Sequence, residues 1–136
     1  MKLPHYHVTA GIIFNGNRIL LGQRRKGSHL GGLWEFPGGK QERGETLEEC
    51  LEREIREELA IDVAVGDLYT SVDHAYESFS ITLHLFICRL IRGEPMAVGV
   101  ADFRWVTLAE LRNFEFPPAD RRILDLMERK PPRPPR

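Results

Sequence analysis

Residues 38–61 read GGKQERGETLEECLEREIREELAI, a glycine-rich loop followed by a stretch with helical periodicity. Thr46 and Glu49 have the spacing of a capping box, so we expect the helix to begin near Thr46. Four apolar residues recur at helical spacing and predict the buried stripe: Leu47, Leu51, Ile55 and Leu59. The rest of the chain should be organised around this helix.

Three glutamates border the predicted stripe instead of pointing away from it: Glu54, Glu57 and Glu58. Like charges at these spacings repel, and partial burial raises the pKa of a carboxyl group, so the arrangement costs stability unless a cation lies among them. Oxygen ligands suit Mg²⁺ or Mn²⁺. The pattern predicts a metal site; the alternative is a solvated helix with i, i+4 ion pairs such as Arg53 with Glu57.

The preceding loop favours the metal site over the solvated helix. Gly38, Gly39 and Gly44 allow backbone conformations and close approaches that other residues forbid. A loop that wraps around phosphate, or that offers a carbonyl group to a metal, needs such residues.

Gly39, Glu45 and the run REIREEL at residues 53–59 have the spacing of the Nudix box, and the chain resembles the Nudix hydrolases. LWEFPGGK before the box and FPPAD after it extend the resemblance, in the manner of the MutT-type branch, over nearly the whole chain. Ala60 stands where the family pattern has glycine. We expect this difference to change only how the helix ends, because glycine is the usual left-handed residue there.

The resemblance implies an α/β fold, the Nudix α/β/α sandwich, with a mixed β-sheet between helices. Hydrophobic patterns predict strands at residues 5–14, 18–24, 62–75, 79–91 and 102–106, a short helix over 108–112 and a last helix after FPPAD. Residues 1–129 should form a single Nudix hydrolase domain. The Pro/Arg-rich tail KPPRPPR, residues 130–136, has nothing to bury and is expected to be extended or disordered.

The resemblance also implies roles for the charged residues of the box. The metal ligands would be the Gly39 carbonyl and three side chains: Glu54, Glu57 and Glu58. Glu45 would be an accessory ligand or a stabiliser of the loop. The ion would be Mg²⁺ or Mn²⁺.

Three residues of the helix are expected to be catalytic: Glu54, Arg53 and Glu57. Arg53 would orient a glutamate through a charged hydrogen bond. Many MutT-type members have a further glutamate where this chain has Gly99, and the nearest acid, Asp102, is three residues away. We therefore assign the catalytic base to Glu54.

The expected substrate contacts lie on both sides of the box: Arg24, His29, Phe36, Gly38, Lys40, Tyr76, Phe79 and Asp120. By resemblance Arg24 contacts phosphate or base, although it could also be a solvated charge at a strand end. His29 lies in a loop that would cover the substrate, the aromatic residues offer flat surfaces for a base, and the GGK loop holds phosphates. Asp120 would read the base, or would merely cap the last helix.

The composition is that of a globular protein of 136 residues with a formal net charge of −1. Its basic residues are dispersed, which argues against a nucleic-acid polymer as partner. Cys50 and Cys88 lack metal-ligand spacing, and the N-terminus lacks the pattern of a signal peptide, so we expect reduced thiols and a cytoplasmic location. No segment has the length and apolarity of a membrane span. A monomer and a homodimer both remain open.

The resemblance to the MutT-type Nudix hydrolases implies a metal-dependent nucleoside triphosphate pyrophosphohydrolase that releases a nucleoside monophosphate and pyrophosphate. Its expected role is to remove 8-oxo-dGTP or related modified nucleotides from the pool, and CTP or a modified dCTP is the alternative substrate. A different class is a non-catalytic Nudix-like nucleotide-binding module. The intact glutamates argue against that class, while Gly99 keeps it open.

Overall fold

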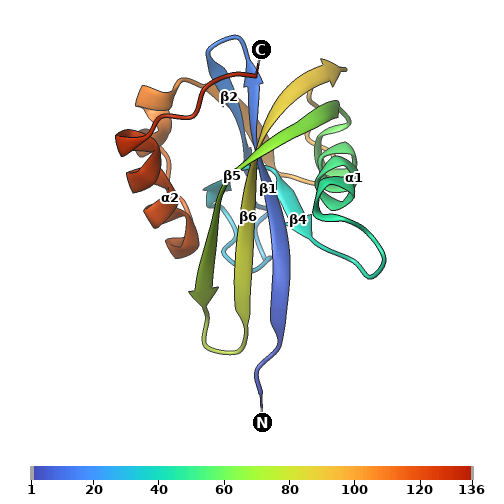
Figure 1. The fold of residues 1–136 in the computed structure, drawn as a ribbon, viewed down its shortest axis with the longest axis vertical. Coiled ribbons are helices and arrows are strands. Elements are labelled where there is room, and N and C mark those ends of the chain that lie inside the picture. Colours follow the sequence, from blue (N-terminus) through green and yellow to red (C-terminus); the bar gives the residue numbers. More distant parts are fainter. Residues whose placement is uncertain (1, 136) are drawn as a thin grey trace.

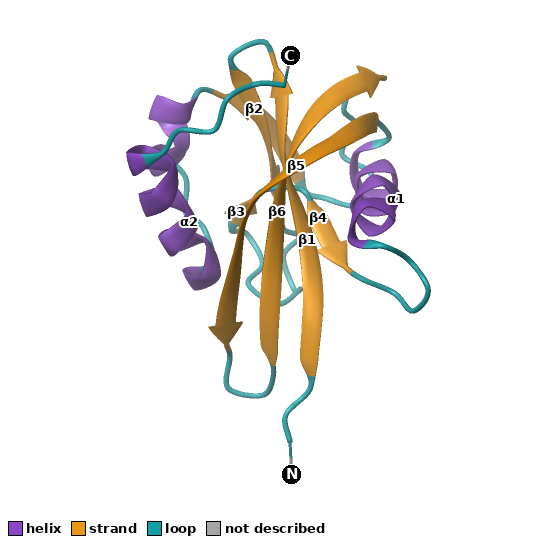
Figure 2. Ribbon diagram, viewed as in Figure 1, coloured by secondary structure: helices purple, strands orange, loops and turns teal. Residues whose placement is uncertain are grey.

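The computed structural model describes residues 2–135, in which a mixed sheet lies between two helices, α1 on one side and α2 on the other (Figure 1). The strands are β1 (His5–Asn15), β2 (Arg18–Gln23), β3 (Trp34–Glu35), β4 (Gly38–Lys40), β5 (Asp62–Ala75), β6 (Ser80–Arg92) and β7 (Asp102–Val106). The helices are α1 (Leu47–Leu59), the 3₁₀ helix η1 (Leu108–Asn113) and α2 (Pro118–Arg129). This arrangement confirms the predicted α/β sandwich (Figure 2).

The sheet has the strand order β3-β2-β1-β6-β5, with β4 paired to β1 and β7 paired to β2. β1 and β6 run parallel, and the other pairs are antiparallel, so the sheet is mixed as predicted. Residues 9–14 of β1 are all buried, because helices and loops cover both faces of this central strand. The register of β1 therefore decides which residues face α1 and which face α2.

The ends of α1 follow the sequence pattern. The Thr46 hydroxyl accepts a hydrogen bond from the Glu49 N–H at 3.0 Å, and the Glu49 carboxylate accepts one from the Thr46 N–H at 2.8 Å. At the other end Ala60 has φ 57° and ψ 33°, the left-handed conformation that glycine adopts more easily. A β-carbon in this conformation costs about 1 kcal/mol. The helix thus ends where expected, with local strain at Ala60.

The glycine-rich loop contains a strand that the sequence interpretation missed. Gly38–Lys40 forms β4, which pairs with residues 8–10 of β1. A β-carbon on Gly38 would lie 1.9 Å from the Thr9 carbonyl oxygen. Glycine is needed here because the two strands approach so closely, which no hydrophobic pattern reveals.

The C-terminal part packs against the face of the sheet opposite α1. The three residues of α2 that were predicted to face inward are buried: Ile123, Leu124 and Met127. Residues 130–135 contain no helix or strand, but Pro132 is buried and the Lys130 carbonyl accepts a hydrogen bond from the Tyr69 hydroxyl. The expectation that the tail has nothing to bury is therefore wrong at Pro132. Residue 136 lies outside the described residues.

Candidate active site

Arg53 is the centre of the charged cluster on α1. Its Nε and Nη2 donate to the two carboxylate oxygens of Glu45 at 3.0 and 2.7 Å, a bidentate pair. Its Nη1 lies 2.9 Å from Glu54 and 3.2 Å from Glu57, and its Nη2 also donates to the Lys40 carbonyl at 3.2 Å. Arg53 thus orients the glutamates and ties α1 to β4, as its predicted role requires.

Glu45 belongs to the loop more than to an open ligand set. Besides the pair with Arg53, its carboxylate accepts a hydrogen bond from the Glu42 N–H at 2.8 Å. The hydrogen bonds from Arg53 and from the Glu42 backbone hold the pKa of Glu45 at about 2. Both carboxylate oxygens have donors, so the structure favours the loop-stabilising role over that of an accessory ligand.

Burial disfavours the ionised form of two glutamates, Glu54 and Glu58. Burial raises the pKa of Glu54 against the opposing effect of Arg53, and burial with the charges of Glu35 and Glu54 raises the pKa of Glu58 to about 9. Glu58 Oε2 is buried and has no hydrogen-bond partner among residues 2–135. A buried acceptor without a donor is costly, and a cation would satisfy it.

The Gly39 backbone lies directly beside the Glu54 carboxyl group. A β-carbon on Gly39 would lie 2.3 Å from the Glu54 carboxyl carbon, so only glycine leaves room for this carboxylate. Crowded oxygen donors with one orphaned oxygen fit a hard divalent cation such as Mg²⁺ or Mn²⁺. In the described part of the chain no three acidic, histidine or cysteine side chains converge on one point, since Arg53 draws Glu54 and Glu57 to itself.

The Gly39 carbonyl does not face this cluster, contrary to its predicted role as a ligand. Its oxygen lies 3.3 Å from Thr9 Oγ1 and 3.5 Å from Cys50 Sγ, on the side of β1. Carbonyl directions alternate along a strand, and the Lys40 carbonyl points toward Arg53. The Gly38 carbonyl therefore points away from β1, and Gly38 is the better candidate for a backbone ligand.

Glu57 and Gly99 complete the surroundings of the cluster. The Glu57 side chain is 60% exposed and is held only by Arg53 among the described residues. The Gly99 N–H donates to the Glu58 carbonyl at 2.9 Å, and a β-carbon on Gly99 would lie 3.1 Å from Glu58 Cα. Position 99 is thus beside the cluster but has no side chain. Asp102 instead pairs with Arg104 at 3.1 Å and does not replace the absent carboxylate.

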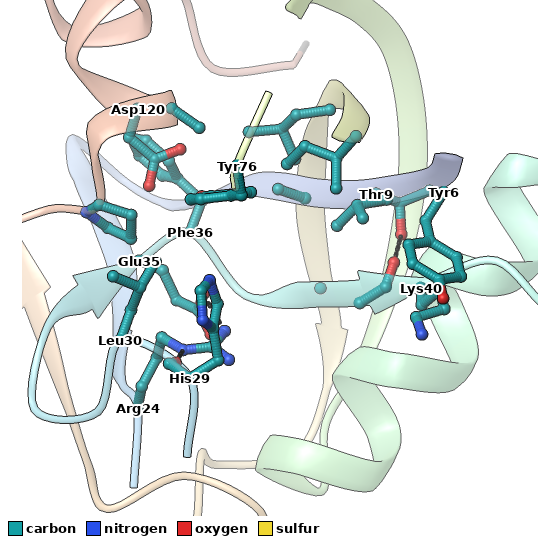
Figure 3. A pocket seen from close by; sticks show the side chains of 18 of the residues that line it. Tyr6, Thr9, Arg24, His29, Leu30, Glu35, Phe36, Lys40, Tyr76 and Asp120 are labelled. Carbon is teal, nitrogen blue, oxygen red and sulfur yellow. Dashed lines mark hydrogen bonds and ion pairs between the residues drawn. The ribbon is translucent and has the colours of Figure 1, made fainter. Parts of the chain in front are cut away.

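A cavity of about 580 Å³ extends from this cluster toward α2. Figure 3 shows Tyr6 and Lys40 at one end, and Arg24, Glu35 and Asp120 at the other. Eight of its lining residues are those expected to contact substrate: Arg24, His29, Phe36, Gly38, Lys40, Tyr76, Phe79 and Asp120. Glu58 lines the cavity too, so the acidic cluster and the substrate contacts share one site.

Arg24 is held inside the cavity and is not a solvated strand-end charge. Its Nη1 donates to Glu35 Oε2 at 2.9 Å, and its Nε donates to the His29 carbonyl at 2.7 Å. The side chains of Arg24 and Glu35 are 30% and 19% exposed. His29 is exposed and contributes this carbonyl and a ring that contacts Tyr76 and Phe79, with centroids 5.0 and 5.4 Å away.

Glu35 is the residue that the sequence interpretation missed. Burial raises its pKa, although Arg24 opposes the shift. The sequence signal was an acid between two aromatic residues in WEF, a segment too short for its period to show which side chains enter a cavity. Its partner Arg24 lies eleven residues earlier and meets it only through pairing of β2 with β3.

Asp120 lies at the opposite end of the cavity from Lys40 and is 5% exposed. Burial and the charge of Glu35 raise its pKa to about 8, and Arg24 opposes this. Within residues 2–135 the N-terminus of α2 has no side-chain cap hydrogen bond. Asp120 therefore faces the cavity as a largely protonated acid at neutral pH, and the structure does not support the helix-cap interpretation.

Phe36 and Lys40, which line the cavity, each contact an aromatic ring. Phe36 is 3% exposed and packs on Phe116 with centroids 5.5 Å apart, so it serves the core as well as the cavity wall. The Lys40 ammonium lies 3.8 Å from the centre of the Tyr6 ring, a cation–π contact that holds it at the cavity end.

Between residues 2 and 135 no helix is long and apolar enough to cross a membrane.

Known proteins resemble this chain in sequence and in fold. The NUDIX domain matches residues 9–126. The 8-oxo-dGTP diphosphatase of Escherichia coli strain K12 is 32% identical, over 90% of this chain and 95% of the relative, and the CTP pyrophosphohydrolase of the same strain is 36% identical, over 87% of each. The MutT protein of Methanosarcina mazei Go1 shares the fold with a TM-score of 0.85, over 98% and 99% of the two chains at 23% identity. The chain therefore belongs to the NUDIX family.

Proposed function

We propose that this protein is a metal-dependent nucleoside triphosphate pyrophosphohydrolase that acts on 8-oxo-dGTP or a related oxidised purine nucleotide. The observation that carries the proposal is a cavity whose lining includes both Glu58 of the acidic cluster and buried Asp120, with Lys40 at the end opposite Asp120. Such a cavity suits a ligand with a polyphosphate at one end and a hydrogen-bonding base at the other. The relative named 8-oxo-dGTP diphosphatase supports the same substrate class.

The acidic cluster would hold Mg²⁺ or Mn²⁺ through Glu54, Glu57 and Glu58 with the Gly38 carbonyl. When bound, the ion neutralises phosphate charge and lowers the barrier to attack by water. Lys40 and the N–H groups of β4 would bind the terminal phosphates, which are the leaving pyrophosphate in this assignment.

Glu54 is the proposed base. Its carboxyl group lies against Gly39 and is oriented by Arg53 at 2.9 Å, and burial raises its pKa, which strengthens a carboxylate as a proton acceptor. A water molecule that attacks phosphorus must lose a proton, and Glu54 would take it. The Gly99 position offers no competing carboxylate.

The base end reads hydrogen-bonding groups of the substrate. A protonated Asp120 both donates and accepts, so it can donate to O6 of 8-oxoguanine and accept from N7–H. Phe36, Tyr76 and Phe79 supply apolar walls for the flat base.

CTP, or a modified dCTP, is the second candidate substrate. The CTP pyrophosphohydrolase relative is 36% identical over 87% of this chain, and a carboxyl group also accepts a hydrogen bond from the N4 amino group of cytosine. The cytoplasm is the proposed location, since Cys50 and Cys88 are free thiols.

A substrate panel tests the proposal. Purified protein is assayed with 8-oxo-dGTP, dGTP, CTP and dCTP in Mg²⁺, Mn²⁺ and excess chelator, and pyrophosphate and orthophosphate are measured separately. We expect 8-oxo-dGTP to have the highest kcat/KM, with pyrophosphate released in one step and no turnover in chelator. Stepwise orthophosphate would refute the binding direction. Nucleotide binding without any turnover would identify a non-catalytic module.

A further inference from the structure

The base end of the cavity contains three ionisable side chains from three elements. Arg24 follows β2, Glu35 belongs to β3, and Asp120 lies in the first turn of α2. Figure 3 shows all three on the same side of the cavity, away from Lys40 and Tyr6. Three further titratable residues line the cavity near them: Tyr76, which follows β5, His29 of the loop after β2, and Glu58 of α1, whose charge interacts with those of Glu35 and Arg24.

Arg24 and Glu35 have opposite effects on Asp120. Burial is the main reason that Asp120 favours its protonated form; the Glu35 carboxylate adds to this effect and the Arg24 guanidinium opposes it. Arg24 is fixed by two hydrogen bonds, one to Glu35 and one to the His29 carbonyl, so its charge is compensated beside Glu35. Without Glu35, the guanidinium would keep its hydrogen bond to the His29 carbonyl, but no carboxylate would offset its charge near Asp120.

We propose that Glu35 is a positioning residue of the base end: it holds Arg24 and so helps to keep Asp120 in the protonated form that can donate a hydrogen bond to the substrate base. This inference rests on the proposed function for the identity of the base. It adds that a residue which does not have to touch the ligand contributes to its recognition. Glu35 thereby extends to higher pH the range in which a base with an acceptor such as O6 is bound.

The first test measures Asp120 without any ligand. The carboxyl carbon of Asp120 is followed by ¹³C NMR from pH 5 to 10 in wild type, Glu35→Gln and Glu115→Gln, with Asp120→Asn to assign the signal. Glu115 is the matched control because it is exposed and adjacent to Trp34, to which its carbonyl is hydrogen-bonded. We expect the Asp120 midpoint to fall by about one pH unit in Glu35→Gln and to stay unchanged in Glu115→Gln.

The second test measures the consequence for binding. The Kd of 8-oxo-dGMP is determined by calorimetry in chelator across the same pH range, which involves neither metal nor turnover. With a midpoint near pH 8 in wild type, a shift of about one unit weakens binding to Glu35→Gln about 3-fold at pH 7.5 and about 8-fold at pH 8.5. In the Asp120→Asn background the amide cannot ionise, so adding Glu35→Gln should leave the pH profile unchanged.

The outcomes separate this inference from the proposed function. If the Asp120 midpoint is unchanged or rises in Glu35→Gln, the inference is wrong whatever the protein binds. If the Glu35→Gln effect on Kd persists in the Asp120→Asn background, Glu35 acts on the ligand or on the fold and not through Asp120. If the midpoint falls as expected but 8-oxo-dGMP does not bind to wild type, the proposed substrate is wrong and the electrostatic role of Glu35 stands.

Discussion

Replacing Glu58 with glutamine should stabilise the metal-free protein while removing its response to metal. Glu58 Oε2 is buried without a partner among the described residues, and the pKa of the group is raised from 4.5 to about 9. At pH values below its unfolded-state pKa, a carboxyl group whose pKa is raised by folding is protonated in both the folded and the unfolded state, and it does not oppose folding. As pH rises from 4.5 through 9, the free energy of unfolding falls because the unfolded state ionises first.

The magnitude follows from this shift. At pH 7.5, about three units above the unfolded pKa, keeping Glu58 protonated in the fold costs about 4 kcal/mol at 1.36 kcal/mol per unit. Glutamine avoids this cost but leaves part of its amide unpaired, which costs about 1 to 3 kcal/mol. We therefore expect Glu58→Gln to raise the free energy of unfolding by about 1 to 3 kcal/mol at pH 7.5. At pH 4.5, where only the cost of the unpaired amide remains, we expect it to lower this free energy by about 1 to 3 kcal/mol.

Urea denaturation in chelator at pH 4.5, 6, 7.5 and 9, repeated with Mg²⁺ and Mn²⁺, measures both effects. Glu52→Gln in the same helix is the matched control, since Glu52 has no part in the acidic cluster. Wild type should gain stability from the metal and Glu58→Gln should gain little. A variant that is less stable at every pH, or that is stabilised by metal as much as wild type, would refute the reasoning about Glu58.

Three further predictions concern α1 and its ends. Glu57→Gln should lose most activity in Mg²⁺ while its free energy of unfolding changes by less than about 0.5 kcal/mol, because an exposed ion pair with Arg53 contributes little; full activity in a steady-state assay would contradict the ligand role. Ala60→Gly should raise the free energy of unfolding by about 1 kcal/mol by relieving the left-handed strain at φ 57°, and a lower melting temperature would argue against that strain. Thr46→Ala should lower it by about 1 kcal/mol through loss of the capping box, which chemical denaturation can measure against a Thr46→Ser control.

The proposed cation would explain why this chain carries a costly group of carboxylates. The buried glutamates and the left-handed Ala60 each reduce stability, and the glutamates are useful only if a ligand compensates their cost. In the proposed function, a cation beside Glu58 in the lining of the cavity provides this compensation. Measuring the free energy of unfolding of Glu58→Gln therefore tests whether Glu58 serves to bind a metal ion.

Local sequence was sufficient for features that depend on neighbours in the chain. The capping box, the start of α1 at Thr46, the apolar stripe and the pairing of Arg53 with Glu57 all join residues three or four positions apart. The strand pattern gave the main β-strands for the same reason, since burial alternates along a strand. The spacing of the Nudix box then identified the family, which the match over residues 9–126 confirmed.

Only the tertiary structure decided the features that depend on pairing between distant segments. The close approach of β4 to β1 turned the Gly39 carbonyl toward Thr9, so the direction of this carbonyl does not fit the ligand role that the resemblance implied. The pairing of β2 with β3 brought Arg24 to Glu35, and the packing of α2 buried Asp120 beside them. The sequence names the ionisable residues, but their charge states depend on desolvation and on neighbours that only the folded chain supplies.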